Sequence, residues 1–137
     1  MRLPLKTEYA CRVLTQLGTL HGSGKLAQID LLARVEDIPA NYLVQILNEL
    51  RKSGLIGSKR GKQGGYFLVD PPDQVTLLDI FRAVDGDGLE GAPQGSGQSG
   101  KRIAEVWKDV SASMHAVLEA ISLKDLMEEE AENMYYI

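Results

Sequence analysis

Apolar side chains recur every three or four residues in four separate stretches of the chain, the spacing that places them on one face of a helix. Each stretch is bounded by residues that favour helix ends. Thr7 and Asp30 stand at the starts of the first two stretches as candidate N-caps, and Gly54 follows the third. We therefore expect helices over residues 7–20, 30–36, 39–52 and 76–86.

Two short apolar runs between the third and fourth helices indicate a β-hairpin. They are "LIGS" at 55–58 and "YFLV" at 66–69, and "KRGKQGG" joins them. Tyr66 and Phe67 favour a strand, and the glycines permit a tight reversal of the chain. Three helices followed by a hairpin is the order of elements in a winged helix-turn-helix. We therefore expect a mainly α fold with a small β-hairpin, a winged helix-turn-helix domain over residues 1–86.

The remaining third of the chain has a different pattern. Residues 87–100 are rich in glycine, which predicts a flexible loop. A long helix follows over 101–121, and the capping-box pattern "SLKD" at 122–125 starts a short acidic helix that we expect to reach about residue 131. The segment 101–137 is thus expected to be a dimerisation helix with a short acidic C-terminal helix.

Apolar residues of the long helix alternate in steps of four and three, the pattern of a coiled-coil seam. A stripe of this length needs a covering partner in water. Either the helix folds back on its own domain, or it pairs with the same helix of a second chain. We favour the second arrangement, a homodimer. The seam residues are Ile103, Trp107, Val110, Met114, Val117 and Ile121.

The composition of the 137 residues is that of an ordinary globular domain, with 44% hydrophobic and 25% charged residues. Cys11 is the single cysteine, which excludes an intramolecular disulfide and favours a cytoplasmic location. The first residues carry charges throughout, which argues against a signal peptide. No apolar run is long enough to predict a membrane span.

Charge is distributed unevenly along the chain, whose formal net charge is −4. Residues 1–69 carry ten Lys/Arg and five Asp/Glu, a balance of +5, whereas residues 70–137 carry five and fourteen, a balance of −9. Cations are densest in "RKSGLIGSKRGK", residues 51–62, which holds five of them and no acid. A polyanion responds to such a local field rather than to the net charge. A solvated charged face is the alternative interpretation.

The third helix and the hairpin both carry side chains suited to DNA. Opposite its apolar stripe the helix presents amides, a cation and an aromatic ring. Asn and Gln amides can pair with adenine, and Lys with guanine. Lys59, Arg60 and Lys62 stand at the hairpin tip, where they would meet the DNA backbone or minor groove. The glycines between them do not indicate a nucleotide-binding loop, because a Walker motif ends in Lys-Ser/Thr.

The stretch "IPANYLVQILNELRKSGLIGSKRGKQGGYFL", residues 38–68, resembles the central motif of the Rrf-two (IscR/NsrR) family of bacterial transcription regulators. In that motif a Tyr-Leu pair opens the recognition helix, a leucine stripe follows, and "GGY" stands in the hairpin. "KTEYACRVL" and "VTLLDIFRAVDG" fit the same family in the same order, and "VWKDV" resembles part of its dimerisation helix. The resemblance implies a homodimeric winged-helix repressor or activator that binds a palindromic DNA operator, and repression is the expected role.

The resemblance also implies which residues contact DNA. Carried over position by position, the recognition helix uses Asn41, Tyr42, Gln45, Asn48 and Lys52. The wing uses Ser58, Lys59, Arg60 and Gly61. Two alternatives stay open: Tyr42 is a packing residue between helices, and Arg60 is a solvated charge on the wing.

This chain departs from the family in one respect that concerns cofactors. Many members ligate an iron–sulfur cluster through three cysteines before the long helix, but here that loop holds none, and such clusters require thiolates. We therefore expect no cluster, no metal site and no other cofactor. Glu8, where some members supply a carboxylate ligand, is expected to be an exposed or helix-start acid. Cys11 is expected to be buried and unreactive, and His21 and His115 form no ligand pattern.

Two other classes of protein compete with a DNA-binding regulator. A winged helix can serve as a protein-interaction adaptor, with the acidic C-terminal half contacting a partner. The cationic N-terminal half and the amide face of the third helix argue against this class. An enzyme is disfavoured because the sequence shows no nucleophile–base pair and no paired catalytic carboxylates. The sequence leaves open whether a regulator of this kind responds to an effector or to a protein partner.

Overall fold

The computed structural model describes residues 3–90 and 94–127. Its elements are α1 (Leu5–Leu20), α2 (Ile29–Glu36), α3 (Ala40–Lys52), β1 (Ile56–Lys59), β2 (Gly65–Leu68), the 3₁₀ turn η1 (Pro72–Gln74), α4 (Leu77–Glu90) and α5 (Gly100–Ala120). The strands β1 and β2 pair antiparallel, with Ile56 opposite Leu68 and Lys59 opposite Gly65. The predicted fold class is confirmed: the chain is mainly α, and its small hairpin is the wing of a winged helix-turn-helix.

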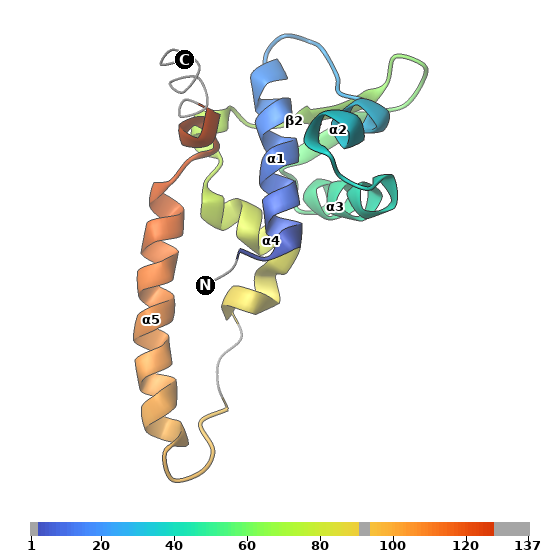
Figure 1. The fold of residues 1–137 in the computed structure, drawn as a ribbon. Helices are drawn as coiled ribbons and strands as arrows, with labels where there is room; N and C mark the ends of the chain where they lie inside the picture. The colour runs from blue at the N-terminus through green and yellow to red at the C-terminus, as the bar shows by residue number, and fades with distance from the viewer. Residues whose placement is uncertain (1–2, 91–93, 128–137) are drawn as a thin grey trace, which may run out of the picture.

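The core forms around α1, which crosses the middle of the molecule, with α2 and α3 on one side and α5 beyond α4 on the other (Figure 1). The apolar stripe of α3 lies against this core. Each fully buried Leu or Ile stabilises the fold by about 1.5–3 kcal/mol relative to an exposed one. The stripe consists of Leu43, Ile46, Leu47 and Leu50, all 0% exposed. Burial of this stripe therefore fixes which face of α3 points outward.

A third extended segment joins the hairpin. Ala27, just before α2, exchanges both backbone hydrogen bonds with Tyr66 of β2, at N···O distances of 3.0 and 2.8 Å. Gly65 permits this close approach, because a Cβ there would lie 2.6 Å from the carbonyl oxygen of Ala27. The wing is thereby fixed to the segment that leads into α2.

Two predicted helix caps are wrong. The first helix begins at Leu5 after Pro4, so Thr7 lies inside it and is 0% exposed. Thr7 lies three residues before Ala10, at the spacing of the buried face, and packing against the core takes precedence over its capping preference. The second helix begins at Ile29, so Asp30 lies in its first turn and Gln28 holds the cap position.

The fourth helix extends further than predicted. It was expected to end at residue 86, but α4 continues to Glu90, after a break at Asp85 where φ is −148° and ψ is 42°. Its last turn therefore occupies part of the segment 87–100 that we expected to be a loop. Glycine costs a helix only about 1 kcal/mol relative to alanine, so a glycine-rich composition does not exclude a helical turn. Residues 91–93 lie outside the described part of the chain. The division into a DNA-binding domain (1–86), a loop (87–100) and a dimerisation segment (101–137) stays a prediction.

The segment after α5 packs back on the core, and its helical turn begins beside the start of α4. Thr76 and Asp79 cap the start of α4 reciprocally, with N···O distances of 3.0 and 3.1 Å. Ser122 and Asp125 do the same for the helical turn over 123–127, at 2.8 and 3.2 Å, which confirms the predicted capping box. An antiparallel bridge joins Thr76 to Ser122, and the following Leu123 is fully buried. The part of this helix expected beyond residue 127 lies outside the described residues.

The long helix α5 matches its predicted range to within one residue at each end. It packs on α4 where Met114 and Leu118 meet Leu78 and Phe81. Within the described ranges, none of the helices combines the length and the apolarity needed to cross a membrane.

Replacing Thr7 with valine is predicted to stabilise the fold. The Thr7 hydroxyl is buried and has no hydrogen-bond partner among the described residues. Valine has the same shape without the polar atom, so Thr7→Val should raise the free energy of unfolding by about 1 kcal/mol. Urea denaturation measures the change.

Thr19 provides the matched control on the same helix. It is exposed, and its hydroxyl bonds the carbonyl oxygen of Gln16 at 2.7 Å. Thr19→Val should leave the unfolding free energy unchanged or slightly lower. A Thr7→Val protein less stable than the wild type would mean that the buried hydroxyl is satisfied in solution.

Candidate nucleic-acid interface

The outward face of α3 presents the predicted base-reading residues. Asn41, Tyr42, Gln45 and Lys52 are exposed, and Asn48 is half-buried. They lie together because the opposite stripe of the helix is buried in the core. Val44 stands among them and is 44% exposed, although its apolar side chain gave no reason to select it from the sequence. The face therefore offers amides, an aromatic ring, a cation and one apolar side chain to a major groove.

Tyr42 packs on α1 and is also partly open to solvent. Its ring meets that of Tyr9 edge-on, with centroids 6.1 Å apart and planes at 80°, and the guanidinium of Arg12 lies 5.4 Å from the Tyr9 ring centroid. The Tyr42 side chain is nevertheless 44% exposed. The packing and DNA-contacting interpretations are therefore compatible, because α1 supports one edge of the ring while the remainder faces solvent.

An ion pair holds α3 on α1. Lys6 Nζ lies 2.6 Å from Glu49 Oε1, and both side chains are about one-third exposed. A pair of this exposure adds little stability by itself, about 0–1 kcal/mol. It adds a contact between α1 and α3, while burial of the apolar stripe sets which face of α3 points outward.

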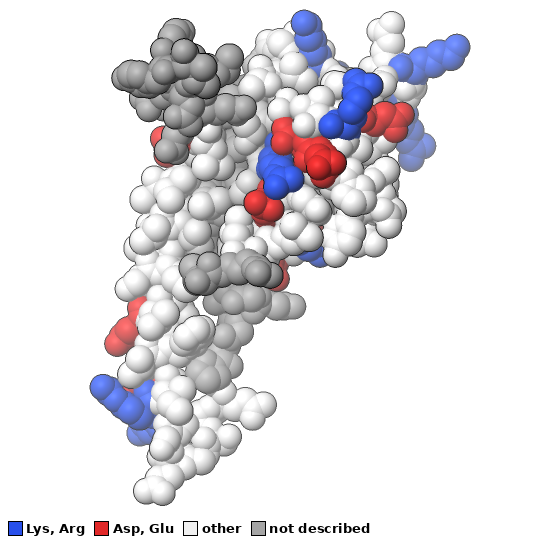
Figure 2. Space-filling model, viewed as in Figure 1, with Lys and Arg blue, Asp and Glu red and all other residues white. Residues whose placement is uncertain are grey.

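The tip of the wing is exposed, cationic and tightly folded. Lys59, Arg60 and Lys62 all face solvent there, and Figure 2 shows cations reaching out at the tip of the hairpin loop, at the upper right of the view. Gly61 has φ +112°, which L residues rarely adopt, and a Cβ at Gly64 would lie 2.2 Å from the carbonyl oxygen of Lys59. The glycines thus allow a loop narrow enough to enter a DNA groove.

A groove of about 510 Å³ lies between the wing, the start of α2 and the end of α3. Its lining comes from three elements: residues 28–30 at the start of α2, Arg51 at the end of α3, and residues 58–61 and 64–66 of the wing. All four predicted wing contacts line it: Ser58, Lys59, Arg60 and Gly61. The groove thus gathers the predicted wing contacts and reaches α3 at Arg51, while the five predicted recognition-helix residues lie outside its lining.

Arg51 joins the two halves and was not selected from the sequence. Its guanidinium donates to Asn48 Oδ1 at 3.2 Å and lies 3.5 Å from Ser58 Oγ, which is at the limit of a hydrogen bond. Its position at the start of the cation-rich run 51–62 was the available signal. Gln28 has a similar role, because its Nε2 donates to the carbonyl oxygen of Lys62 at 3.1 Å and anchors the wing to α2.

The predicted seam of α5 is divided between two environments. Met114 and Ile121 are half-buried, and Met114 packs on α4 of the same chain. The other four seam residues are uncovered: Ile103 (57% exposed), Trp107 (47%), Val110 (40%) and Val117 (61%). Figure 2 shows few charged side chains along the upper part of α5 in this view. Folding back on its own domain thus covers only one edge of the helix.

The environment of Cys11 keeps its thiol protonated. The residue is half-buried on α1, and burial together with the charge of Glu8 raises the pKa of the thiol to about 11. Glu8 itself pairs with Arg12 at 3.2 Å. Among the described residues, His, Cys, Asp and Glu nowhere gather in a group of three that would hold a metal ion.

Comparison with known proteins places this arrangement in a family. The model of the Rrf2 family, described as an iron-dependent transcriptional regulator, matches residues 3–129. The HTH-type transcriptional regulator CymR of Bacillus subtilis is 30% identical over the full length of both chains. The protein Rv1287 of Mycobacterium tuberculosis is 39% identical over 92% of this chain and 81% of its own length.

Solved structures agree with the sequence relatives. The structure of CymR (YrzC), the global cysteine regulator of B. subtilis, aligns with a TM-score of 0.77 at 28% identity, over 94% of this chain and 98% of that one. The structure of T. potens IscR aligns with a TM-score of 0.76 at 30% identity, over 97% and 90% of the two chains. Recognition helix, wing and long helix are therefore matched together, and the chain belongs to the Rrf2 family of DNA-binding transcriptional regulators.

Proposed function

We propose that the protein is a homodimeric repressor that binds a palindromic operator in the cytoplasm. One observation carries the proposal: Arg51 of α3 donates to Asn48 on the amide face and lies 3.5 Å from Ser58 of the wing, so the amide face and the cationic wing adjoin. A DNA duplex fits this arrangement, because its major groove admits a helix while the flanking backbone meets cations. An acidic partner protein would not require the amides.

The two halves of the interface have different tasks in this proposal. Asn41 and Gln45 lie on the outward face of α3, where their amides can reach base edges and so determine sequence preference. Lys59 and Arg60 lie on the wing, where they neutralise phosphates or enter a narrow minor groove. Ser58 and Gly61 allow the wing backbone to approach the DNA closely.

A second copy of the chain is the proposed cover for the α5 seam. Ile103, Trp107, Val110 and Val117 form an apolar stripe that α4 leaves uncovered. Two such helices side by side would bury these stripes at the twofold axis. A dimer of this kind would present two recognition helices to half-sites about one helical turn apart, which is why a palindromic operator is expected.

The residues of this chain do not fit the iron–sulfur cluster that the family description suggests. A cluster of that kind requires several thiolates, and Cys11 is the only cysteine in the sequence. Its thiol pKa of about 11 also opposes ligation at neutral pH. Glu8, the other residue in question, already pairs with Arg12. We therefore propose a regulator that senses its signal without a cluster.

The helix and the wing should lose DNA affinity in different ways when truncated. Arg60→Ala should weaken binding to every duplex and lower the slope of log K against log salt by about 1, because one phosphate contact is lost. Gln45→Ala should cost about 1–3 kcal/mol on the operator and little on other DNA, because a base contact is lost. The measurement is a salt titration of each variant on an operator selected from random duplexes and on its scrambled sequence.

Glu36→Gln serves as the control, since Glu36 lies at the end of α2, away from the groove, and its substitution removes a charge of the opposite sign. Equal losses for both truncations on both duplexes would contradict the division between helix and wing. No loss for either truncation would remove this face from DNA binding and favour the protein-interaction adaptor.

Charging the seam should separate the dimer. The double variant Val110→Asp, Val117→Asp places two carboxylates on the uncovered stripe, where dimerisation would bury them at high cost. We expect a monomer by multi-angle light scattering, with operator affinity reduced at least tenfold because the two half-sites no longer act together. Ala112→Asp with Ala116→Asp adds the same charge on the opposite face and should remain dimeric. A dimeric seam variant would show that the stripe has another partner.

Anaerobic reconstitution with iron and sulfide should leave the protein colourless, because a cluster requires several thiolates and the sequence has one cysteine.

Cys11 also permits a test of its protonation: at pH 8 a thiol with pKa of about 11 is ionised in about one molecule in a thousand. Iodoacetamide should therefore modify Cys11 far more slowly in the folded protein than in urea, and the rate should rise with pH up to about 11. A brown protein with stoichiometric iron, or fast modification at pH 8, would refute this account of the site.

A further inference from the structure

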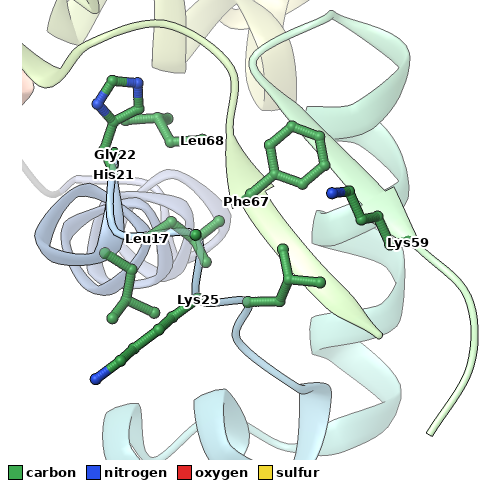
Figure 3. Close-up of a pocket in the computed structure, with 10 residues that line it drawn as sticks. Leu17, His21, Gly22, Lys25, Lys59, Phe67 and Leu68 are labelled. Carbon is green, nitrogen blue, oxygen red and sulfur yellow. The ribbon is translucent and has the colours of Figure 1, made fainter. Parts of the chain in front are cut away.

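A pocket of about 210 Å³ lies behind the wing, between the end of α1, the turn that follows it and the hairpin (Figure 3). Neither the base-reading face of α3 nor the α5 seam contributes to it. Its walls are mostly apolar and include Leu17, Leu20, Phe67 and Leu68, while Lys25 and Lys59 contribute cations. An apolar pocket with a few charged groups at its edge is the usual form of a small-molecule site.

The apolar wall is held rigidly in place. Leu17 and Leu68 belong to the core and are at most 3% exposed. The Phe67 ring lies directly over Gly57 on the neighbouring strand, because a Cβ at Gly57 would stand 2.4 Å from the ring. A ligand would thus meet a preformed surface, which lowers the entropic cost of binding.

The two cations differ in orientation. Lys59 Nζ lies 6.0 Å from the centroid of the Phe67 ring. In Figure 3 the Lys59 ammonium turns toward that ring, whereas the Lys25 side chain runs away from it. Lys59 therefore supplies the positive charge beside the apolar wall, and the position of Lys25 leaves it to solvent.

Lys59 also lines the groove that borders the recognition helix, so it stands between the pocket and the proposed DNA interface. Its neighbours Arg60 and Gly61 line the groove but not the pocket. A negative charge placed in the pocket would pair with the same ammonium that is available to a phosphate. Each partner would then lower the affinity for the other by the same factor.

We propose that this pocket binds a small monocarboxylic acid with one compact apolar group, and that the bound carboxylate draws Lys59 away from DNA. An apolar cavity of about 150 Å³ is enough for a benzene ring, so this pocket suits one ring or a branched chain of similar size. The apolar group packs on Leu17, Phe67 and Leu68, and the carboxylate accepts a hydrogen bond from Lys59 Nζ. The effect on DNA rests on the proposed function, whereas ligand binding does not.

The first experiment titrates benzoate into the DNA-free protein and follows backbone amide shifts by NMR. We expect saturable shifts centred on residues 17–26 and 67–68, at least tenfold weaker binding of uncharged benzyl alcohol, and a similar loss in Lys59→Gln, because a charge-assisted hydrogen bond is removed. Arg60→Gln and Lys25→Gln are the matched controls and should bind benzoate as the wild type does.

Two results would overturn the ligand assignment. Absence of saturable shifts with both compounds would show that the pocket is not a binding site for this class. Equal binding of benzoate and benzyl alcohol, or a loss in Lys25→Gln but not in Lys59→Gln, would show that Lys59 does not hold the carboxylate.

The second experiment measures affinity for a random-sequence duplex at low salt, with and without saturating benzoate. Because Lys59 would contact phosphate, we expect roughly fivefold weaker binding with benzoate, and no such effect in Lys59→Gln. If benzoate leaves the DNA affinity of the wild type unchanged, the coupling between pocket and DNA is overturned. Whether the pocket binds benzoate at all is decided separately by the NMR titration. A protein that binds no duplex under either condition would instead refute the proposed function.

Discussion

Burial of the apolar stripe of α3 against α1 is the constraint on which the other features depend. Leu43, Ile46, Leu47 and Leu50 are excluded from water, and each contributes about 1.5–3 kcal/mol to that packing. A helix with one face fixed in a core has only one face left for solvent. The exposure of Asn41 and Gln45 is thus a direct consequence of the burial of this stripe.

The wing acquires its place from the same core by a different route. The buried side chains of Leu68 and Ile56 anchor the hairpin on the core, and the Ala27–Tyr66 bridge ties it to the segment before α2. Side-chain packing and backbone hydrogen bonds therefore hold the wing together, the first on the core and the second on the segment before α2. Glycine at position 65 is required for this contact, since any side chain there would meet the carbonyl oxygen of Ala27.

Much of this arrangement was predictable from the sequence because periodicity reports burial. The helices, the hairpin and the reciprocal cap of Ser122 and Asp125 all follow from local patterns. Three features were not predicted from the local patterns. Thr7 has the chemistry of a cap but lies in the core, α4 extends into glycine-rich sequence, and Arg51 acquires its place between helix and wing only when the chain folds. Cation density marked its region, but not its contacts.

The central claim is that α3 and the wing form one DNA-binding face. Mapping backbone amide shifts in a complex with the selected operator tests it most directly. The account predicts the largest shifts over residues 41–52 and 58–62, with smaller ones at the start of α2 near Gln28. Shifts confined to α5 or to the acidic segment after it would contradict the account, because they would place the DNA on a surface where neither the amides nor the wing cations take part.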